Sequence, residues 1–128
     1  MIRPKLLVID DQRTILTTLR KVAEEVGYLV EATQDPKRFK ELIRSFAPDV
    51  IVIDVVMPEE DGLELLRFLA EQKVTTSVIM ISDYGPQVLS TVGRLGSALG
   101  LNVRAVQKPL VPSGWRGLLT PGKATGEG

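Results

Sequence analysis

The side chains that could do chemistry in this chain follow short apolar runs. They are Asp10 and Asp11 after residues 6–9, Asp54 after 50–53, Ser82 after 78–81, and Lys108 just after 103–106. Short continuous apolar runs are typical of strands that are buried on both faces of a parallel sheet. Because such sheets bind ligands at the carboxyl ends of their strands, we expect these side chains to converge at one edge.

The expected cluster holds three carboxylates, one hydroxyl and one ammonium group. Three neighbouring carboxylates repel one another unless a cation neutralises them, and an all-oxygen ligand set suits Mg²⁺ or a similar hard ion. A phosphoryl group fits the whole set. One carboxylate would accept it, the metal and the lysine would neutralise charge, and the hydroxyl with loop amides would hold the product oxygens.

Each of these residues also has an ordinary structural interpretation. The acidic pair could cap the following helix, and Asp54 could simply end a strand. Ser82 could bond its own loop backbone, and Lys108 could be a solvated surface residue. Four features at the same end of successive strands favour a shared site, because independent structural roles do not require that placement.

Composition narrows the chemistry and the partners. The 128 residues include no His and no Cys, which excludes an imidazole base, a thiolate nucleophile, an ordinary zinc site and a disulfide within the chain. Sixteen basic residues balance sixteen acidic ones, which disfavours direct binding of nucleic acid or of an anionic membrane. The sequence shows neither a membrane span nor a signal peptide, so we expect a cytoplasmic protein.

The elements that would position the cluster alternate along the chain. Strands are predicted at 6–9, 29–32, 50–53, 78–81 and 103–106, and helical patterns at 15–26, 36–46, from about 61 to 69, and 86–99. This alternation predicts an α/β fold: a doubly wound, five-stranded parallel sheet with helices on both faces. Gly93 and Gly96 each cost about 1 kcal/mol relative to alanine, so the helix at 86–99 should be the least stable.

The last eighteen residues differ from the rest, since they contain five of the eleven glycines and two of the eight prolines. Such a composition disfavours a long helix. We expect a shortened or irregular fifth helix, at most over 113–119. The domain is therefore predicted to span 1–111, followed at 112–128 by a short helical turn and a flexible tail or linker remnant.

Taken together, the chemical residues resemble those of a known family. The acidic pair, the segment Asp-Val-Val-Met-Pro at 54–58, Asp-Gly at 61–62, Ser82 and Lys-Pro at 108–109 resemble the receiver domain of two-component response regulators, the CheY-like superfamily. The resemblance covers about residues 5–111 and implies a flavodoxin-like fold. It also implies a phosphorylation-dependent signalling switch that does not turn over a separate substrate.

The resemblance assigns roles in phosphoryl transfer and metal binding. Asp54 would be the phosphoacceptor, and the donor would be a histidine kinase or a histidine phosphotransfer protein. The metal would be Mg²⁺, held by Asp11, Asp54 and the backbone carbonyl of Val56. Asp10 would act mainly through a metal-bound water.

Four further positions take expected roles from the same resemblance. Lys108 would bond phosphoryl oxygens, and Ser82 would swing inward to bond one of them. The bond before Pro109 would be cis, a conformation that proline makes accessible. Gly62 would let the preceding loop turn into the third helix.

The sequence departs from the family at two positions and in its tail. Ala105 occupies the place of an aromatic residue whose ring turns inward in other members, so the output must use Ser82, residues 83–86 and the fourth helix. Asp83 replaces a small residue, and its charge would weaken phosphoryl retention unless it points to solvent or caps a helix. The short fifth-helix segment argues against a dimer formed through the face of the fourth helix, fifth strand and fifth helix.

Two other functions compete with the switch. A pseudo-receiver, an interaction module that no longer switches by phosphorylation, is suggested by Ala105 and Asp83. A phosphoaspartate hydrolase would need an acidic residue where Val56 stands. Residues 99–110 also resemble receivers joined to EAL-type cyclic-di-GMP phosphodiesterases, which suggests a linked output domain outside this chain.

Overall fold

The computed structural model describes residues 3–55, 62–82, 86–108 and 111–120. Within these ranges, strands and helices alternate as the apolar pattern predicts. The strands are β1 Lys5–Ile9, β2 Leu29–Thr33, β3 Val50–Asp54, β4 Ser77–Ser82 and β5 Asn102–Gln107. The helices are α1 Arg13–Val26, α2 Pro36–Ser45, α3 Gly62–Glu71, α4 Pro86–Ala98 and α5 Pro112–Leu119.

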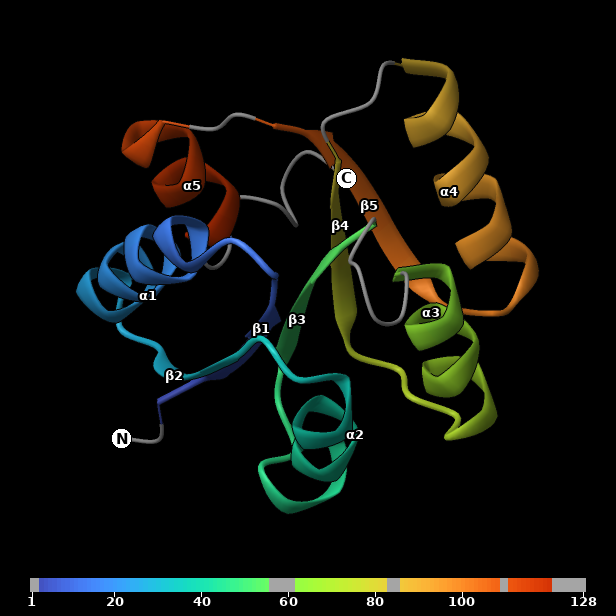
Figure 1. Cartoon of the computed structure of the whole chain (residues 1–128), viewed down its shortest axis with the longest axis horizontal. Helices are drawn as coiled ribbons and strands as arrows, with labels where there is room; N and C mark the ends of the chain where they lie inside the picture. The colour runs from blue at the N-terminus through green and yellow to red at the C-terminus, as the bar shows by residue number, and fades with distance from the viewer. Residues whose placement is uncertain (1–2, 56–61, 83–85, 109–110, 121–128) are drawn as a thin grey trace.

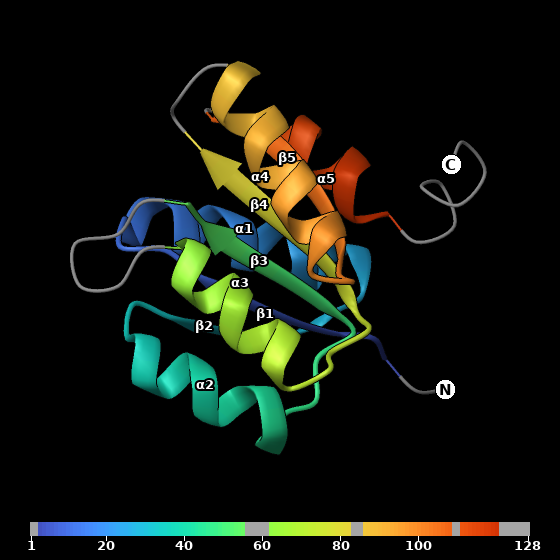
Figure 2. The same cartoon turned by 90° about the vertical axis from the view of Figure 1, so that its right-hand side faces the viewer.

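All strand pairs are parallel, and the order across the sheet is β2-β1-β3-β4-β5. The chain reverses its direction of travel across the sheet between β1 and β3, which makes their carboxyl ends the topological switch point. In Figure 2 the arrowheads of β3 and β4 point to the same side of the molecule. The predicted doubly wound, five-stranded sheet is therefore confirmed.

Helices cover both faces of the sheet (Figure 1). Alternate residues of the central strands pack against α2, α3 and α4 on one face and against α1 and α5 on the other. In β3, for example, Ile51 and Ile53 belong to the first core and Val52 to the second. This explains why the central strands are apolar without interruption rather than alternating.

The two edge strands are less buried than the sequence suggests. The prediction treated all five strands as buried, yet most of β2 is half-buried or exposed, and no residue of β5 is fully buried. An edge strand has a neighbour on one side only, and β5 is covered mainly by α4. The short apolar runs at 29–32 and 103–106 do not reveal this difference, because position within a sheet is not a local property.

Helix α5 belongs to the same core as the rest of the domain. It lies beside α1, and its residues Trp115 and Leu119 are 0% and 2% exposed. The Tyr28 hydroxyl donates a buried hydrogen bond of 2.9 Å to the carbonyl oxygen of Leu119. The helix is short, as expected, but a boundary at residue 111 would cut through this packing.

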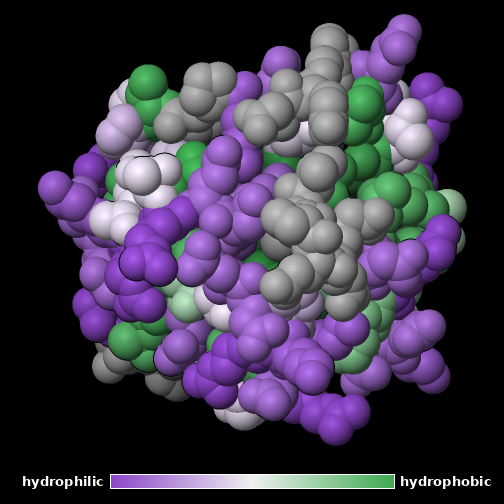
Figure 3. Space-filling model, viewed as in Figure 1, coloured by the Kyte–Doolittle hydropathy of each residue, from purple (hydrophilic) through white to green (hydrophobic). Residues whose placement is uncertain are grey.

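Much of the surface seen in Figure 3 is hydrophilic, with apolar area gathered on the side where α4 lies. Within the described ranges, none of the helices combines the length and apolarity needed to cross a membrane.

Candidate functional site

Two buried aspartates form the base of the site. Asp10 follows the last residue of β1, and Asp54 is the last residue of β3, so the pairing of these strands brings their carboxylates together. Asp10 is 0% exposed and Asp54 is 4% exposed. Carboxylates are almost never buried this completely without a partner, so the site needs positive charge.

Asp11 completes an acidic cluster at the same edge. Oxygen atoms of Asp10, Asp11 and Asp54 lie within 4.8 Å of one another, and Asp11 is exposed while the other two are buried. Asp10 Oδ2 is buried and has the Lys108 ammonium nitrogen 3.1 Å away, so this oxygen already faces positive charge. The exposed carboxylate of Asp11 and the buried carboxylates of Asp10 and Asp54 together form a suitable set of oxygen ligands for Mg²⁺.

Lys108, the residue directly after β5, supplies positive charge. Its ammonium nitrogen lies 3.1 Å from Asp10 Oδ2 and 3.4 Å from Asp54 Oδ2, and its side chain is 4% exposed. Its backbone N–H donates to the carbonyl oxygen of Ser82 at 2.6 Å, which ties the end of β5 to the end of β4. The predicted convergence of lysine and aspartates is observed.

Burial and charge act in opposite directions on these groups. Burial raises the pKa of Asp10 above its ordinary value, and a hydrogen bond from the Gln12 backbone and the Lys108 charge only partly offset this. Burial lowers the pKa of Lys108, but the Asp10 and Asp54 carboxylates outweigh it and hold that pKa above its ordinary value. Lys108 is therefore charged at neutral pH, and the ionised form of Asp10 is held at a cost.

Ser82 lies next to the cluster. It is the last residue of β4, follows Ile81, which pairs with Asp54, and is 1% exposed. Its position places a hydroxyl beside the carboxyl end of β3, as the sequence predicts. The inward swing expected for Ser82 is a change between states and stays a prediction.

Gly62 has a different structural reason from the one expected. It is the first residue of α3, and its N–H donates to Val55 O at 2.7 Å. A Cβ atom at this position would meet the carbonyl oxygen of Asp54 and would lie 2.8 Å from Val55 Cα. Glycine is needed because helix α3 starts against the backbone at the end of β3, which leaves no space for a side chain.

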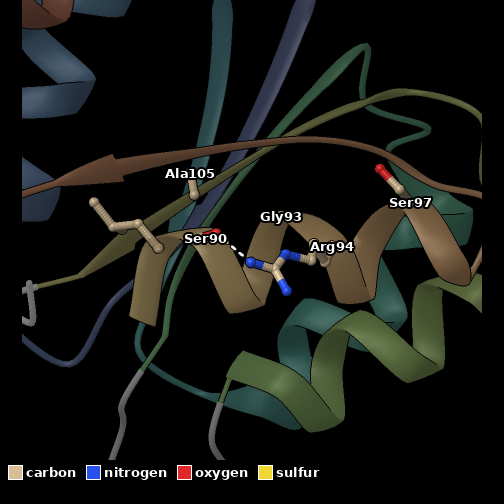
Figure 4. A pocket seen from close by; sticks show the side chains of 6 residues that line it. Ser90, Gly93, Arg94, Ser97 and Ala105 are labelled. Carbon is tan, nitrogen blue, oxygen red and sulfur yellow. Dashed lines mark hydrogen bonds between the residues drawn. The ribbon is translucent and has the colours of Figure 1, made fainter. Parts of the chain in front are cut away.

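Ala105 lines a groove between α4 and β5 (Figure 4). The groove has a volume of about 550 Å³ and is also lined by Leu89, Ser90, Gly93, Arg94 and Ser97. The Arg94 guanidinium donates a hydrogen bond of 3.3 Å to Ser90 Oγ, which lies one turn earlier on α4. The Ala105 methyl group and Gly93 thus border open space.

Three expected site residues lie outside the described residues. They are Val56, Asp83 and Pro109. Their expected roles, including the carbonyl ligand and the cis bond, therefore stay predictions.

The structure adds one residue that sequence reasoning missed. Gln12 is the N-cap of α1, and its Oε1 accepts a hydrogen bond of 3.2 Å from the Lys108 ammonium group. Its own N–H donates to Asp10 Oδ1 at 2.8 Å. Glutamine is unusual at an N-cap, where Ser, Thr, Asp and Asn are preferred, and this was the signal available in the sequence.

Comparison with known protein families and curated relatives gives a consistent result. A family model described as "Response regulator receiver domain" matches residues 6–98. The response regulator MprA of Mycolicibacterium vanbaalenii is 45% identical over 65 residues, covering 51% of this chain and 28% of MprA. PhoP of Bacillus subtilis, a transcriptional regulatory protein of alkaline phosphatase synthesis, is 35% identical over 78 residues, covering 61% of this chain and 32% of PhoP.

Solved structures extend the similarity to nearly the whole chain. A response regulator from Colwellia psychrerythraea is 32% identical, with a TM-score of 0.82 over 97% of this chain and 99% of that one. This alignment includes the C-terminal part that the family model leaves out. In contrast, the chain spans only about a third or less of the length of the two curated relatives.

Proposed function

This chain belongs to the response regulator receiver domain family, and from that premise we propose that Asp54 is the residue whose phosphorylation operates the switch. Receiver domains are phosphorylation-dependent signalling switches rather than typical enzymes. One observation carries the choice of Asp54. Its carboxylate is buried at the end of β3, with the Lys108 ammonium 3.4 Å away and the other two carboxylates of the acidic cluster beside it.

The proposed reaction moves one phosphoryl group from a phosphohistidine to Asp54. A carboxylate oxygen of Asp54 attacks phosphorus, an O–P bond forms, and the N–P bond to the donor imidazole breaks. The imidazole keeps the bonding electrons and takes up a proton. Lys108 holds negative charge on the phosphoryl oxygens through its fixed ammonium group, and Ser82 supplies a hydroxyl that can bond one of them.

The acidic cluster fits Mg²⁺ by its donor atoms, since three carboxylate oxygens lie within 4.8 Å of one another at this edge. Asp10, Asp11 and Asp54 would hold the ion, together with the carbonyl of Val56 expected from the family. When bound, it would neutralise charge on the phosphoryl oxygens. It would also offset the repulsion among the three carboxylates.

The pseudo-receiver alternative gains no support from the site. Its motivation was Ala105 and Asp83, yet the acid cluster, the hydroxyl and the lysine are all in place. The small residue at 105 changes the α4–β5 groove rather than the acidic site. We therefore keep the active switch as the proposed function.

The proposed partners follow from the reaction. The phosphoryl donor is a histidine kinase or a histidine phosphotransfer protein, which supplies the imidazole that this chain lacks. The curated relatives are much longer than their matched segments, so a linked output domain is also proposed. An EAL-type phosphodiesterase is the candidate suggested by residues 99–110, and a cytoplasmic location fits these partners.

The test uses acetyl phosphate and Mg²⁺ with intact-mass measurement. We expect the wild-type chain to gain the mass of one phosphoryl group, because acetyl phosphate can replace the phosphohistidine and release acetate. The variant Asp54→Asn keeps the shape of the side chain and should gain nothing. Persistent labelling of Asp54→Asn would assign the acceptor elsewhere, and an unlabelled wild type that also ignores beryllofluoride would favour the pseudo-receiver.

A further inference from the structure

We propose that Gln12 is a positioning residue for phosphoryl acceptance, acting through the Lys108 ammonium group. The inference rests on the proposed function and names a residue beyond the five on which that function was built. Gln12 and Lys108 are 96 residues apart in sequence, yet their side chains meet at 3.2 Å. The hydrogen bond has one possible sense, because a lysine ammonium only donates and the amide must present its oxygen.

The backbone of Gln12 is held firmly enough for this task. Its N–H donates to Asp10 Oδ1 at 2.8 Å, and its carbonyl oxygen accepts from Ile15 N and Leu16 N in the first turn of α1. Its side chain does not cap the helix, although it occupies the N-cap position. The carboxamide is thus directed to the lysine rather than to the free amides of α1.

Oxygen atoms from three side chains surround the Lys108 ammonium group. Asp10 and Asp54 contribute carboxylates at 3.1 and 3.4 Å, and Gln12 contributes a neutral amide oxygen at 3.2 Å. An ammonium group has three N–H donors. These three neighbours therefore match its donors in number.

The three contacts would respond differently to the reaction. A bound cation would draw on the charge of Asp10 and Asp54, and phosphorylation would replace the Asp54 carboxylate contact with contacts to the phosphoryl oxygens, so both original carboxylate contacts of Lys108 weaken. Gln12 is not in the acidic cluster and carries no charge to lose. Its contact would keep the ammonium group in place while the phosphoryl group arrives, which is the condition for electrostatic stabilisation by a preorganised donor.

The experiment compares rates of phosphoryl acceptance from acetyl phosphate at saturating Mg²⁺, followed by intact mass. Gln12→Met keeps the length of the side chain but removes the amide acceptor, and we expect a rate about fivefold to tenfold lower, as for loss of one hydrogen bond of ordinary strength. Gln12→Glu restores an acceptor oxygen and should react faster than Gln12→Met. Gln107→Met is the matched control, because Gln107 is the exposed sequence neighbour of Lys108 and should keep the wild-type rate.

Two further measurements separate positioning from a structural or metal-binding role. The Mg²⁺ dissociation constant, measured from amide chemical shifts, should change less than twofold in Gln12→Met, since Asp10, Asp11 and Asp54 stay in place. The side-chain NMR signal of the Lys108 ammonium group should broaden in the resting Gln12→Met protein, because its exchange with water is no longer restrained.

A wild-type rate in Gln12→Met, or an unchanged Lys108 signal, would overturn the proposal while leaving the proposed function intact. A loss of Mg²⁺ affinity in proportion to the rate would assign Gln12 to the metal site instead. Failure of the wild-type chain itself to accept a phosphoryl group would count against the proposed function, and the Lys108 signal would still report whether Gln12 holds the ammonium group.

Discussion

At the scale of single residues, burial of the Asp10 carboxylate makes its ionised form unfavourable, and the neighbouring groups do not fully offset this cost in free energy. Its side chain is completely buried, and burial raises its pKa despite the Gln12 hydrogen bond and the nearby Lys108. At neutral pH the ionised carboxylate therefore lowers the stability of the metal-free fold. This cost is a property of a site prepared to receive a cation.

We predict that Asp10→Asn raises the free energy of unfolding of the metal-free chain at neutral pH. Asparagine keeps an oxygen for the Gln12 N–H but removes a buried charge from the acidic cluster. Because the pKa of Asp10 is higher in the folded than in the unfolded state, the penalty develops as pH rises from the unfolded to the folded pKa. The advantage of Asp10→Asn should therefore shrink as pH falls through the folded pKa.

Urea denaturation in the presence of a chelator, over a series of pH values, measures the difference in free energy of unfolding between Asp10→Asn and the wild-type protein. Added Mg²⁺ should stabilise the wild-type protein and stabilise Asp10→Asn much less, because ligand binding to the folded state adds to its stability. A stability difference that does not vary with pH would contradict the explanation based on the Asp10 charge.

At the scale of elements, α4 contains two glycines with different surroundings. A Cβ atom at Gly96 would lie 2.7 Å from Val103 Cβ on β5, whereas a Cβ atom at Gly93 would meet nothing within 4 Å. Gly96 thus allows the close approach of α4 to the edge strand. Gly93 only lowers the helix propensity of α4 and borders the groove beside Ala105.

We predict opposite effects for alanine at these two positions. Gly93→Ala should stabilise the domain by about 1 kcal/mol, because it removes the conformational cost of glycine within a helix. Gly96→Ala should destabilise it by about 1–3 kcal/mol, because the added methyl group overpacks against Val103. Thermal and urea unfolding of the two variants measures both values, and equal effects would contradict the assigned contact.

At the scale of the whole molecule, α5 connects the C-terminal segment to the rest of the domain. Trp115 and Leu119 fill the core under α1, and Arg116 bonds Glu25 of α1 at 2.6 Å. The exposed ion pair contributes little, and the apolar contacts carry the stability. The unit that folds should therefore extend through α5.

Truncation tests this extent directly. A chain ending at Val111 loses both buried side chains and should be destabilised by more than about 5 kcal/mol, which approaches the total stability of a small domain. A chain ending at Thr120 keeps α5 and should unfold like the full-length chain. Circular dichroism with urea titration measures both, and equal stability of the two chains would support a domain boundary at 111.

The sequence alone predicted the sheet and most of the candidate site. Apolar runs at residues 6–9, 50–53 and 78–81 are local features, and the handedness of parallel crossovers turns them into one sheet with a common carboxyl edge. The chain therefore had to bring Asp10, Asp54 and Ser82 together. The same rule predicted the position of Lys108 at this edge, since Lys108 lies just beyond the fifth strand.

Only the tertiary structure decided which side chains touch across that edge and which segments close the core. The hydrogen bond from Lys108 to Gln12 joins two strand-end loops, and the need for Gly62 comes from the approach of α3 to the backbone of β3. Helix α5 packs through Trp115 and Leu119 in a segment rich in glycine and proline, and a single apolar pair at i, i+4 spacing is too short a pattern to identify a buried face. Such contacts depend on distances between elements far apart in sequence, whereas patterns along the chain report only which face of each element avoids water.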